Sequence, residues 1–341
     1  MTPHPVTAPT AAPALQRPAL VADIGGTNAR FALTDLAAPR PSLHAVQNLP
    51  CGGYASLQHA AEAYLAGIGV APTQAAIAVA CPVDGDAIRL TNRAWAFSRR
   101  ELQAVLGFER LEVLNDFGAV AWSVPALAPG DVVPLHGDPA LPTRGPVSVL
   151  GPGTGLGVAL LVGDARRGWQ VVETEGGHVS FAPIGEEEQK IQRWMNQRFG
   201  RTSNERLLCG AGLSHIEAAL RDPGTGPGPL GERASVLRDP AAIVEAALEG
   251  HDLDARRTLA RFCAVLGSVA GDTALIHGAK SVMIAGGIVP RFIPFLQASA
   301  FRERFLAKGR FAAYLEKVSL HVITHPQPGL LGAACALRAA E

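Results

Sequence analysis

The chain has 341 residues, of which 48% are hydrophobic and 6% aromatic. This length allows one large domain or two medium ones with a well-buried core, and the composition is typical of an α/β protein with many tight turns. Lysine plus arginine number 30, as do aspartate plus glutamate, so no net charge favours nucleic acid or an anionic membrane as a partner.

Residues 1–17 are rich in proline, alanine and threonine. A signal peptide needs a basic start and an uninterrupted apolar stretch, and this segment has neither, so we expect a disordered tail. No apolar run approaches the length needed to cross a bilayer. The five cysteines form no C-x-x-C pair, which disfavours a zinc site or a redox dithiol and is typical of reduced cysteines in a cytoplasmic protein.

From residue 18 the apolar pattern becomes regular. Two apolar runs, 19–25 and 30–36, meet at a Gly-Gly-Thr-Asn turn and predict a pair of strands. The elements expected next are a strand near 43–49, a helix over 54–66, a buried strand over 75–81 and a short strand over 111–114.

The second half of the chain repeats this opening. A proline-rich stretch, 125–146, is interpreted as a hinge or a crossing between lobes. Beyond it, a strand, a Gly/Thr turn and a returning strand recur over 146–162, which indicates an internal structural duplication. The elements expected after the repeat are helices over 185–199, 203–208, 211–220 and 329–340, a loop over 222–231, a buried strand over 281–285, and a long core helix over 252–276 whose small residues Gly267, Ala270 and Gly271 permit close approach by another element.

The turn after the first strand is the first candidate for chemistry. Glycines between two strands let backbone N–H groups approach an anion with no Cβ in the way. The hydroxyl of Thr27 can donate to a phosphate, and Asp23 can hold Mg²⁺. An ordinary hairpin turn with a solvated aspartate explains the same residues.

The segment 151–157, Gly-Pro-Gly-Thr-Gly-Leu-Gly, superficially resembles a dinucleotide fingerprint. A strand follows it, whereas the Rossmann mechanism needs a helix N-terminus at the pyrophosphate. It is not a Walker A loop either, because no Gly-Lys-Ser/Thr follows. Two Gly/Thr turns in corresponding halves could instead bind one triphosphate from both sides.

Polar side chains in three further segments are also candidates for chemistry. Asp116 is well placed as a general base for a substrate hydroxyl, although Asn115 or Asp116 could simply cap the next helix. Glu175 and His178, separated by two glycines, suit a small polar ligand such as a sugar; a metal site and a plain turn are the alternatives. Glu205 lies in the first turn of a predicted helix, where a glutamate is often only a helix-dipole or capping residue.

Together with Gly286 and Gly287, which could admit an adenine ring or simply form a strand-to-helix turn, these segments resemble the ATP-dependent glucokinases of bacteria, in the hexokinase and actin-like ATPase superfamily. The resemblance spans about residue 20 to residue 340 and rests on LVADIGGTNARFAL, LTNRAWAFS, LNDF, GPGTGLGVALL, EGGHVSFAP, ERLLCGAGL and AGGI.

The resemblance implies an α/β fold of the two-lobed actin-like ATPase (ribonuclease H-like) type, with duplicated mixed-sheet domains around a cleft. A small lobe would comprise 18–126 and 323–341, and a large lobe 127–322. Closure of the cleft on the sugar would exclude water from the phosphate.

It also implies an activity, the phosphorylation of the 6-hydroxyl of D-glucose by MgATP in the first step of glycolysis. Asp116 would be the catalytic base. The positions that match the glucose-binding residues are Asn115, Glu175, His178 and Glu205. The positions that match the nucleotide segments are Ala22, Asp23, Ile24, Gly25, Gly26, Thr27, Gly153, Thr154, Gly155, Gly286 and Gly287, and Asp23 would assist the Mg²⁺ ion.

Other interpretations stay open at this point. Many related kinases of the repressor/kinase (ROK) family carry a Cys-rich zinc motif after their sugar-binding histidine, whereas here no cysteine follows His178 before Cys209, so the chain resembles the zinc-free branch. Another hexose or another phosphoryl donor is an alternative. A sugar-responsive repressor is disfavoured, because the segment ahead of Asp23 is short and proline-rich and lacks a helix-turn-helix module. A cytoplasmic homodimer is expected from the resemblance.

Overall fold

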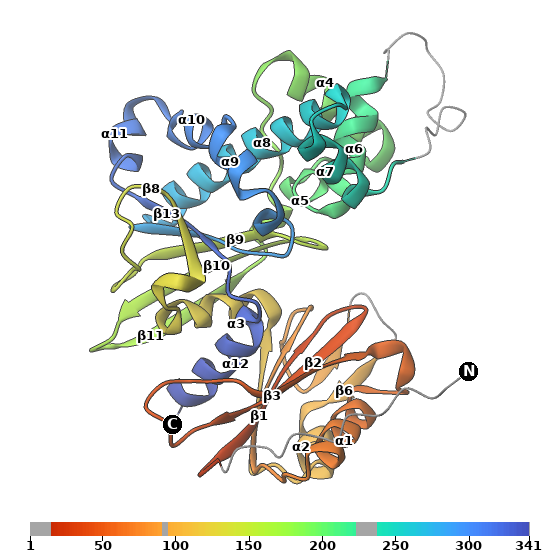
Figure 1. The fold of residues 1–341 in the computed structure, drawn as a ribbon, viewed down its shortest axis with the longest axis vertical. Coiled ribbons are helices and arrows are strands. Elements are labelled where there is room, and N and C mark those ends of the chain that lie inside the picture. The colour runs from red at the N-terminus through yellow and green to blue at the C-terminus, as the bar shows by residue number, and fades with distance from the viewer. Residues whose placement is uncertain (1–14, 91–94, 223–236, 341) are drawn as a thin grey trace. The chain divides into compact units, whose positions relative to one another are not determined.

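The computed structural model describes residues 15–90, 95–222 and 237–340. The chain divides into two compact units (Figure 1): unit 1 consists of residues 1–126 and 326–341, and unit 2 of residues 127–325. Each unit contains its own mixed sheet. Most of the expected disordered tail, 1–17, and most of the expected loop, 222–231, lie outside the described residues.

The sheet of unit 1 has the strand order β3-β2-β1-β4-β7. The bounds are β1 Pro18–Ile24, β2 Asn28–Asp35, β3 His44–Pro50, β4 Gln74–Val79 and β7 Arg110–Asn115. Strands β1 to β3 form an antiparallel meander, and β4 and β7 run parallel to β1. All five strands were predicted from the sequence. A separate hairpin of β5 (Ala87–Arg89) and β6 (Ala96–Ser98) was not.

Apolar side chains cover both faces of this sheet. Leu20 and Ala22 of β1 contribute to one core, and Ala19 and Val21 contribute to the other. Because successive side chains of a strand point to opposite faces, a continuous apolar run requires a covering layer on each side. The helices of unit 1 are α1 Leu57–Ile68, α2 Arg99–Val105, α3 Asp116–Ser123 and α12 Pro328–Ala339. Helices α1 and α12 confirm the two helices predicted for this unit.

The sheet of unit 2 has the order β11-β10-β9-β12-β13-β8. Its bounds are β8 Val132–His136, β9 Val147–Pro152, β10 Leu156–Asp164, β11 Gly168–Thr174, β12 Ser281–Ile284 and β13 Ser319–Ile323. Strands β9 to β11 form an antiparallel meander, and β12 and β13 continue the sheet parallel to β9. This repeats the order and directions of unit 1, so the predicted duplication and the mixed α/β fold are confirmed.

Strand β8 was not predicted from the sequence. It lies in the proline-rich stretch 125–146, interpreted as a hinge or a crossing between lobes, and its residues 132–136 pair antiparallel with β13 at the edge of the sheet. Proline cannot donate a ladder hydrogen bond and is therefore tolerated mainly in edge strands, which is where Pro134 lies. The prolines concealed this strand from the sequence analysis.

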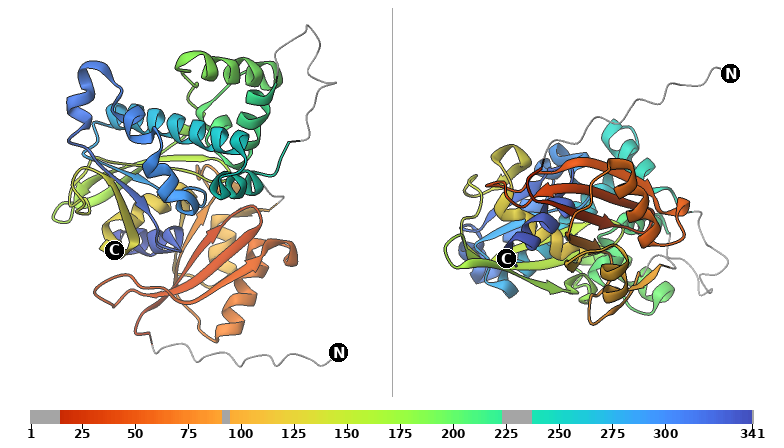
Figure 2. Two further views of the ribbon diagram at one scale, coloured as in Figure 1. Left: turned by 45° about the horizontal axis from the view of Figure 1, so that its top comes forward. Right: turned by 90° about the horizontal axis from the view of Figure 1, so that it is seen from below.

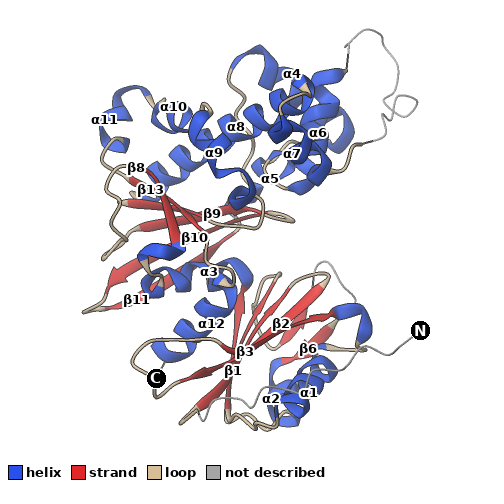
Figure 3. Cartoon of the chain, in the orientation of Figure 1, coloured by secondary structure: helices blue, strands red, loops and turns tan. Residues whose placement is uncertain are grey.

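The helices of unit 2 gather on one side of its sheet, as Figure 2 and Figure 3 show. Their bounds are α4 Gly185–Phe199, α5 Asn204–Leu207, α6 Gly210–Arg221, α7 Pro240–Glu249, α8 Leu253–His277, α9 Ile293–Ala298, α10 Phe301–Leu306 and α11 Ala312–Leu315. Helices α4, α5, α6 and α8 confirm predicted helices, whereas α7 and α9 to α11 were not predicted.

Helix α8 is the central core helix of unit 2. A Cβ at Gly267 would lie 2.1 Å from the carbonyl oxygen of Phe301, and one at Gly271 would lie 2.6 Å from that of Phe305, so the predicted close approach is made by α10. Contrary to the expectation that no apolar run approaches a membrane-spanning length, α8 is long and apolar enough to do so. However, 72% of its apolar window is buried, as in the core helix of a soluble protein.

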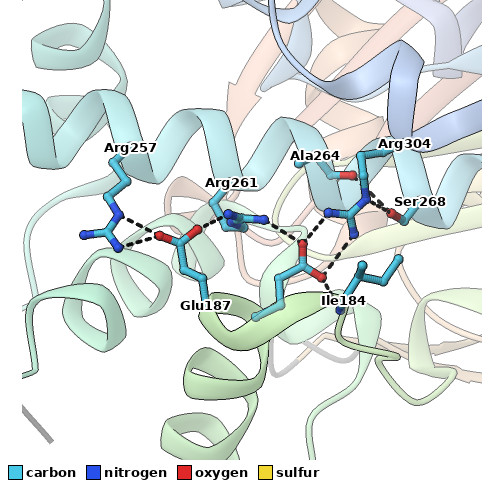
Figure 4. Close-up of polar contacts among 8 residues, drawn as sticks. Ile184, Glu187, Arg257, Arg261, Ala264, Ser268 and Arg304 are labelled. Carbon is cyan, nitrogen blue, oxygen red and sulfur yellow. Dashed lines mark hydrogen bonds and ion pairs between the residues drawn. The ribbon is translucent and has the colours of Figure 1, made fainter. Parts of the chain in front are cut away.

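A buried ion network ties α4 to α8 and α10 (Figure 4). The fully buried carboxylate of Glu188 accepts hydrogen bonds from Arg261 Nη1 at 2.9 Å and Arg304 Nη1 at 2.8 Å. Its other oxygen accepts the backbone amide of Ile184 at 2.8 Å. The neighbouring Glu187 also pairs with Arg261. Because a buried charge is costly unless it is paired and hydrogen-bonded, this network fixes the start of α4.

Candidate active site

The first glycine turn, residues 25–27, joins β1 to β2 in unit 1. The Gly25 amide donates to the Asn28 carbonyl at 2.9 Å, and the Thr27 carbonyl accepts from the Cys51 amide at 2.9 Å. This is a hairpin turn, as the simpler interpretation of the sequence had it. These hydrogen bonds join backbone groups of the turn. The side chain of Thr27 is exposed.

Asp23 lies near the end of β1 but is not a solvated aspartate. Its Oδ2 accepts from Arg30 Nη1 at 3.0 Å, and its side chain is only 20% exposed. Burial raises the pKa of this carboxyl group, and the guanidinium of Arg30 acts in the opposite direction. A Cβ at Gly329, in the first turn of α12, would lie 3.0 Å from the Asp23 carboxylate, so the positive end of that helix also faces the charge.

Asn115 and Asp116 lie where β7 passes into α3. The Oδ1 of Asn115 accepts the amides of Phe117 at 2.9 Å and Gly118 at 3.1 Å, so Asn115 is the N-cap, as one interpretation proposed. Asp116 is the first residue of the helix and is half-buried. Burial raises the pKa of the Cys81 thiol, and the negative charge of Asp116 raises it further.

Parallel pairing of strands brings the first glycine turn and Asp116 to the same edge of the unit 1 sheet. Ile24, Val79 and Asn115 are in register across β1, β4 and β7, and strands are about 4.8 Å apart. The first glycine turn and Asp116 therefore both follow the carboxyl ends of parallel strands at this edge, where ligands of open α/β sheets bind.

The second glycine turn, residues 153–155, joins β9 to β10 in unit 2. The Gly153 amide donates to the Gly155 carbonyl at 2.8 Å, and the Gly153 carbonyl accepts from the Gly210 amide at 2.9 Å. Gly286 follows the neighbouring parallel strand β12 with φ +89°, and a Cβ there would lie 2.2 Å from the Pro152 carbonyl oxygen. The second glycine turn and the pair Gly286-Gly287 therefore lie side by side.

Three polar side chains also meet in unit 2, and they are called the acid–histidine cluster. His178 Nε2 lies 3.8 Å from Glu175 Oε2, and His178 Nδ1 lies 3.8 Å from Glu205 Oε1. The side chains of Glu175 and His178 are 65% and 55% exposed, and that of Glu205 is 31% exposed. The cluster offers acceptors and an imidazole to a polar ligand from solvent.

The backbone brings Glu205 to His178 although the two are far apart in the sequence. The segment after His178 pairs with the segment before Glu205: the Asn204 amide donates to the Val179 carbonyl at 2.9 Å, and the Phe181 amide donates to the Thr202 carbonyl at 3.0 Å. Sequence reasoning missed the contribution of Arg201, whose guanidinium donates to the His178 carbonyl at 3.0 Å.

Glu205 does not cap helix α5, although it is an acidic residue in the first turn of that helix, as the helix-dipole alternative had it. Helix α5 is capped by Ser203, whose hydroxyl accepts the Arg206 amide at 3.3 Å. The carboxylate of Glu205 instead accepts the amide of Leu156, directly after the second glycine turn, at 3.0 Å. Across the described ranges of the chain, no group of three or more His, Cys, Asp and Glu side chains is arranged to hold a metal ion.

The predicted site residues thus form one group in each unit. Those of unit 1 are Ala22, Asp23, Ile24, Gly25, Gly26, Thr27, Asn115 and Asp116. Those of unit 2 are Gly153, Thr154, Gly155, Glu175, His178, Glu205, Gly286 and Gly287. Within each unit, the residues lie at the carboxyl ends of parallel strands or in segments tied to them by hydrogen bonds.

Comparison with known proteins gives concordant matches over almost the whole chain. The sequence profile of the glucokinase family matches residues 20–340. The chain is 43% identical over 331 residues to a glucokinase of Chromohalobacter salexigens, across 96% of this chain and 99% of the relative. It is 45% identical over 327 residues to a glucokinase of Xanthomonas euvesicatoria, across 93% and 94%. The crystal structure of a glucokinase from an Antarctic psychrotroph is 36% identical, with a TM-score of 0.80 over 94% of this chain and 98% of that one.

Proposed function

The chain belongs to the glucokinase family and is an ATP-dependent hexose kinase that phosphorylates glucose, and from this premise we propose which of its residues perform each step. Asp116 is the general base that accepts the proton of the 6-hydroxyl as that oxygen attacks the γ-phosphorus of ATP. The attacking oxygen bonds to phosphorus, the bond to the β-phosphate oxygen breaks, and ADP leaves. Phosphoryl transfer needs mainly positioning and charge neutralisation, with a carboxylate to take the proton.

The observation that carries this assignment is the position of Asp116 in the first turn of α3, at the sheet edge that also bears the first glycine turn. The positive end of the helix favours the ionised carboxylate that a base requires. Asn115, as the cap, fixes where the helix begins and so where Asp116 lies.

Glucose is bound by Glu175, His178, Glu205 and Asn115 in this proposal. The acid–histidine cluster combines carboxylate acceptors with an imidazole that can both donate and accept, which suits a ring of hydroxyl groups. Asn115 uses Oδ1 for the helix cap, so in this proposal it would contribute to the sugar through Nδ2, a donor that also bonds to the Cys81 carbonyl at 3.4 Å.

ATP is bound by the two glycine turns and by Gly286 and Gly287. Backbone amides of the turns would bind the phosphates, and the glycine pair, beside the second turn, would accept the adenosine. Mg²⁺ bound with ATP would neutralise the charge that develops on the transferred phosphoryl group. Asp23 fits a role beside this ion, since it is a carboxylate at a strand end whose Oδ2 is already fixed by Arg30.

The finer features of the enzyme are also proposals. The sequence motifs support a kinase that needs Mg²⁺ but no zinc, and the resemblance to the zinc-free branch supports a cytoplasmic homodimer. Metal analysis of the purified protein would test the absence of zinc, and sedimentation at several concentrations would test the homodimer. A stoichiometric zinc content, or a monomer at every concentration, would contradict them.

The direct test of the function is a coupled assay of the purified chain with a panel of hexoses and phosphoryl donors. We expect turnover with glucose and MgATP, glucose 6-phosphate as the product, and little activity with polyphosphate. Turnover of fructose or mannose without turnover of glucose would overturn the assignment of glucose as the substrate.

A further inference from the structure

The carboxylate of Glu205 contacts the acid–histidine cluster and the second glycine turn at the same time. Its Oε1 lies 3.8 Å from His178 Nδ1, while its Oε2 accepts the Leu156 amide at 3.0 Å. The two oxygens of one side chain therefore meet the proposed glucose-binding residues on one side and the proposed phosphate-binding turn on the other.

Leu156 supports the cluster through both of its backbone polar groups. Its amide holds Glu205, and its carbonyl lies beneath Gly177, where a Cβ would be only 2.1 Å from the carbonyl oxygen. Gly177 stands between Glu175 and His178. Leu156, the first residue of β10, therefore contacts both the Glu205 side chain and the segment that carries Glu175 and His178.

Gly155 leaves the space that the Glu205 carboxylate occupies. A Cβ at Gly155 would lie 2.4 Å from Glu205 Oε2 and 3.3 Å from its Cδ, and the three atoms nearest to that position all belong to Glu205. Gly155 is not among the described glycines with a positive φ, so its backbone conformation does not require glycine. What a Cβ at this position would disturb is the side chain of Glu205.

We propose that Gly155 and the Leu156 amide are positioning elements for glucose recognition: the turn that binds the ATP phosphates also sets the carboxylate that binds the sugar. This inference rests on the proposed function, in which Glu205 is a glucose ligand. It predicts that a substitution in the phosphate-binding turn weakens glucose binding even when no nucleotide is present.

The variant that tests this is Gly155→Ala. The added methyl group would meet the far end of a flexible side chain rather than backbone, so the carboxylate should move while the fold is retained. The control is Gly153→Ala in the same turn, where the nearest atom to an added Cβ is 4.0 Å away and the φ is likewise not positive. Both variants add one methyl group to the turn, but only the first displaces Glu205.

The measurement is isothermal calorimetry of glucose binding without nucleotide, with thermal unfolding as a check of the fold. Gly155→Ala should weaken glucose binding by roughly tenfold or more, the size of one hydrogen bond to a charged group, whereas Gly153→Ala should leave the Kd for glucose within about twofold. Equal glucose affinities of the two variants would overturn the proposal.

A third variant separates this inference from the proposed function. Glu205→Ala should weaken glucose binding, and Gly155→Ala should have little further effect in that background, because its only target is gone. If Glu205→Ala binds glucose normally, the assignment of Glu205 as a glucose ligand fails. If Glu205→Ala weakens binding but Gly155→Ala does not, only the positioning role fails. Additive losses in the double variant would show that Gly155 acts by another route.

Discussion

The two units share one sheet topology but carry different chemistry at corresponding strand ends. In unit 1, a carboxylate, Asp23, stands two residues before the first glycine turn. In unit 2 the residue two before the second turn is Gly151, and a Cβ there would lie 2.2 Å from the carbonyl oxygen of Ala285. The same point of the fold therefore offers a charged group in one unit and only closely packed backbone in the other.

The groups that are tied to the two sheets differ as well. Unit 1 presents Asp116 directly after β7, on a helix whose start is fixed by Asn115. Unit 2 presents the acid–histidine cluster from segments beyond the sheet, which are held to it by the Leu156–Glu205 hydrogen bond and by the pairing of segments around residues 179 and 204. The comparison teaches that the duplicated topology determines where site residues arise, while the local segments determine their chemistry.

The largest expected effect is a loss of catalytic rate when Asp116, the carboxylate that unit 1 presents after β7, is changed. Asp116→Asn removes the proposed base but keeps a polar residue in the first turn of α3, so we expect kcat to fall by roughly two orders of magnitude or more while glucose binding remains measurable. Steady-state kinetics and calorimetry would separate the two effects. The control is Glu101→Gln, because Glu101 is likewise an acidic residue in the first turn of a helix, α2. Similar kcat values for both variants would show that the base lies elsewhere.

The next effect concerns the stability of unit 2 and its buried ion network around Glu188. Glu188→Ala leaves the charges of Arg261 and Arg304 without their buried partner. We therefore expect the free energy of unfolding, measured in urea, to fall by about 3–5 kcal/mol. The matched control is Glu187→Ala. Glu187 is adjacent and also pairs with Arg261, but its side chain keeps 21% of its exposure whereas that of Glu188 is fully buried, so we expect a smaller loss than for Glu188→Ala. Equal losses would show that burial does not determine the strength of this network.

The sheet of unit 1, strands β9, β10 and β12 of unit 2, and both glycine turns were predictable because their signals are local. Apolar runs such as 19–25 and the glycines that interrupt them fall within a short window of sequence, and the recurrence of the pattern at 146–162 revealed the duplication. The candidate residues were found by different routes: Asp116 follows a predicted strand and His178 follows a glycine pair, whereas Glu205 was assigned a role only through the resemblance. Strand β8 escaped because its proline obscured the pattern, and β11 and β13 were not predicted either.

The contacts that hold the site could not be predicted for a different reason. On local sequence alone, Glu205 was interpreted as a helix-dipole or capping residue, because a glutamate in a first helical turn commonly acts as one. Its hydrogen-bond partner, Leu156, is 49 residues away in the sequence. The Arg304 partner of Glu188 is 116 residues away. No periodicity or motif encodes such pairings, since they arise only when tertiary packing brings distant segments together.

The smallest expected effect is a pH dependence of stability that originates in unit 2. Burial lowers the pKa of His215, His277 and His321 below the ordinary value for histidine, so the unfolded chain binds protons more readily than the folded chain. Their stabilising contribution is therefore present above the unfolded pKa of about 6.5 and is lost as the pH falls through it toward the lowered values. The melting temperature should fall between about pH 7.5 and about pH 5.5.

His215→Phe tests the origin of this dependence. His215 lies between the rings of Trp194 and Phe199, with centroids 6.0 Å and 5.1 Å away, so phenylalanine can occupy its place without leaving a cavity and without titrating. The variant should lose less melting temperature over the same pH range than the parent chain. His59→Asn is the control, because the side chain of His59 is exposed, whereas that of His215 is buried. If both variants keep the full pH dependence of the parent, His215 does not contribute to it.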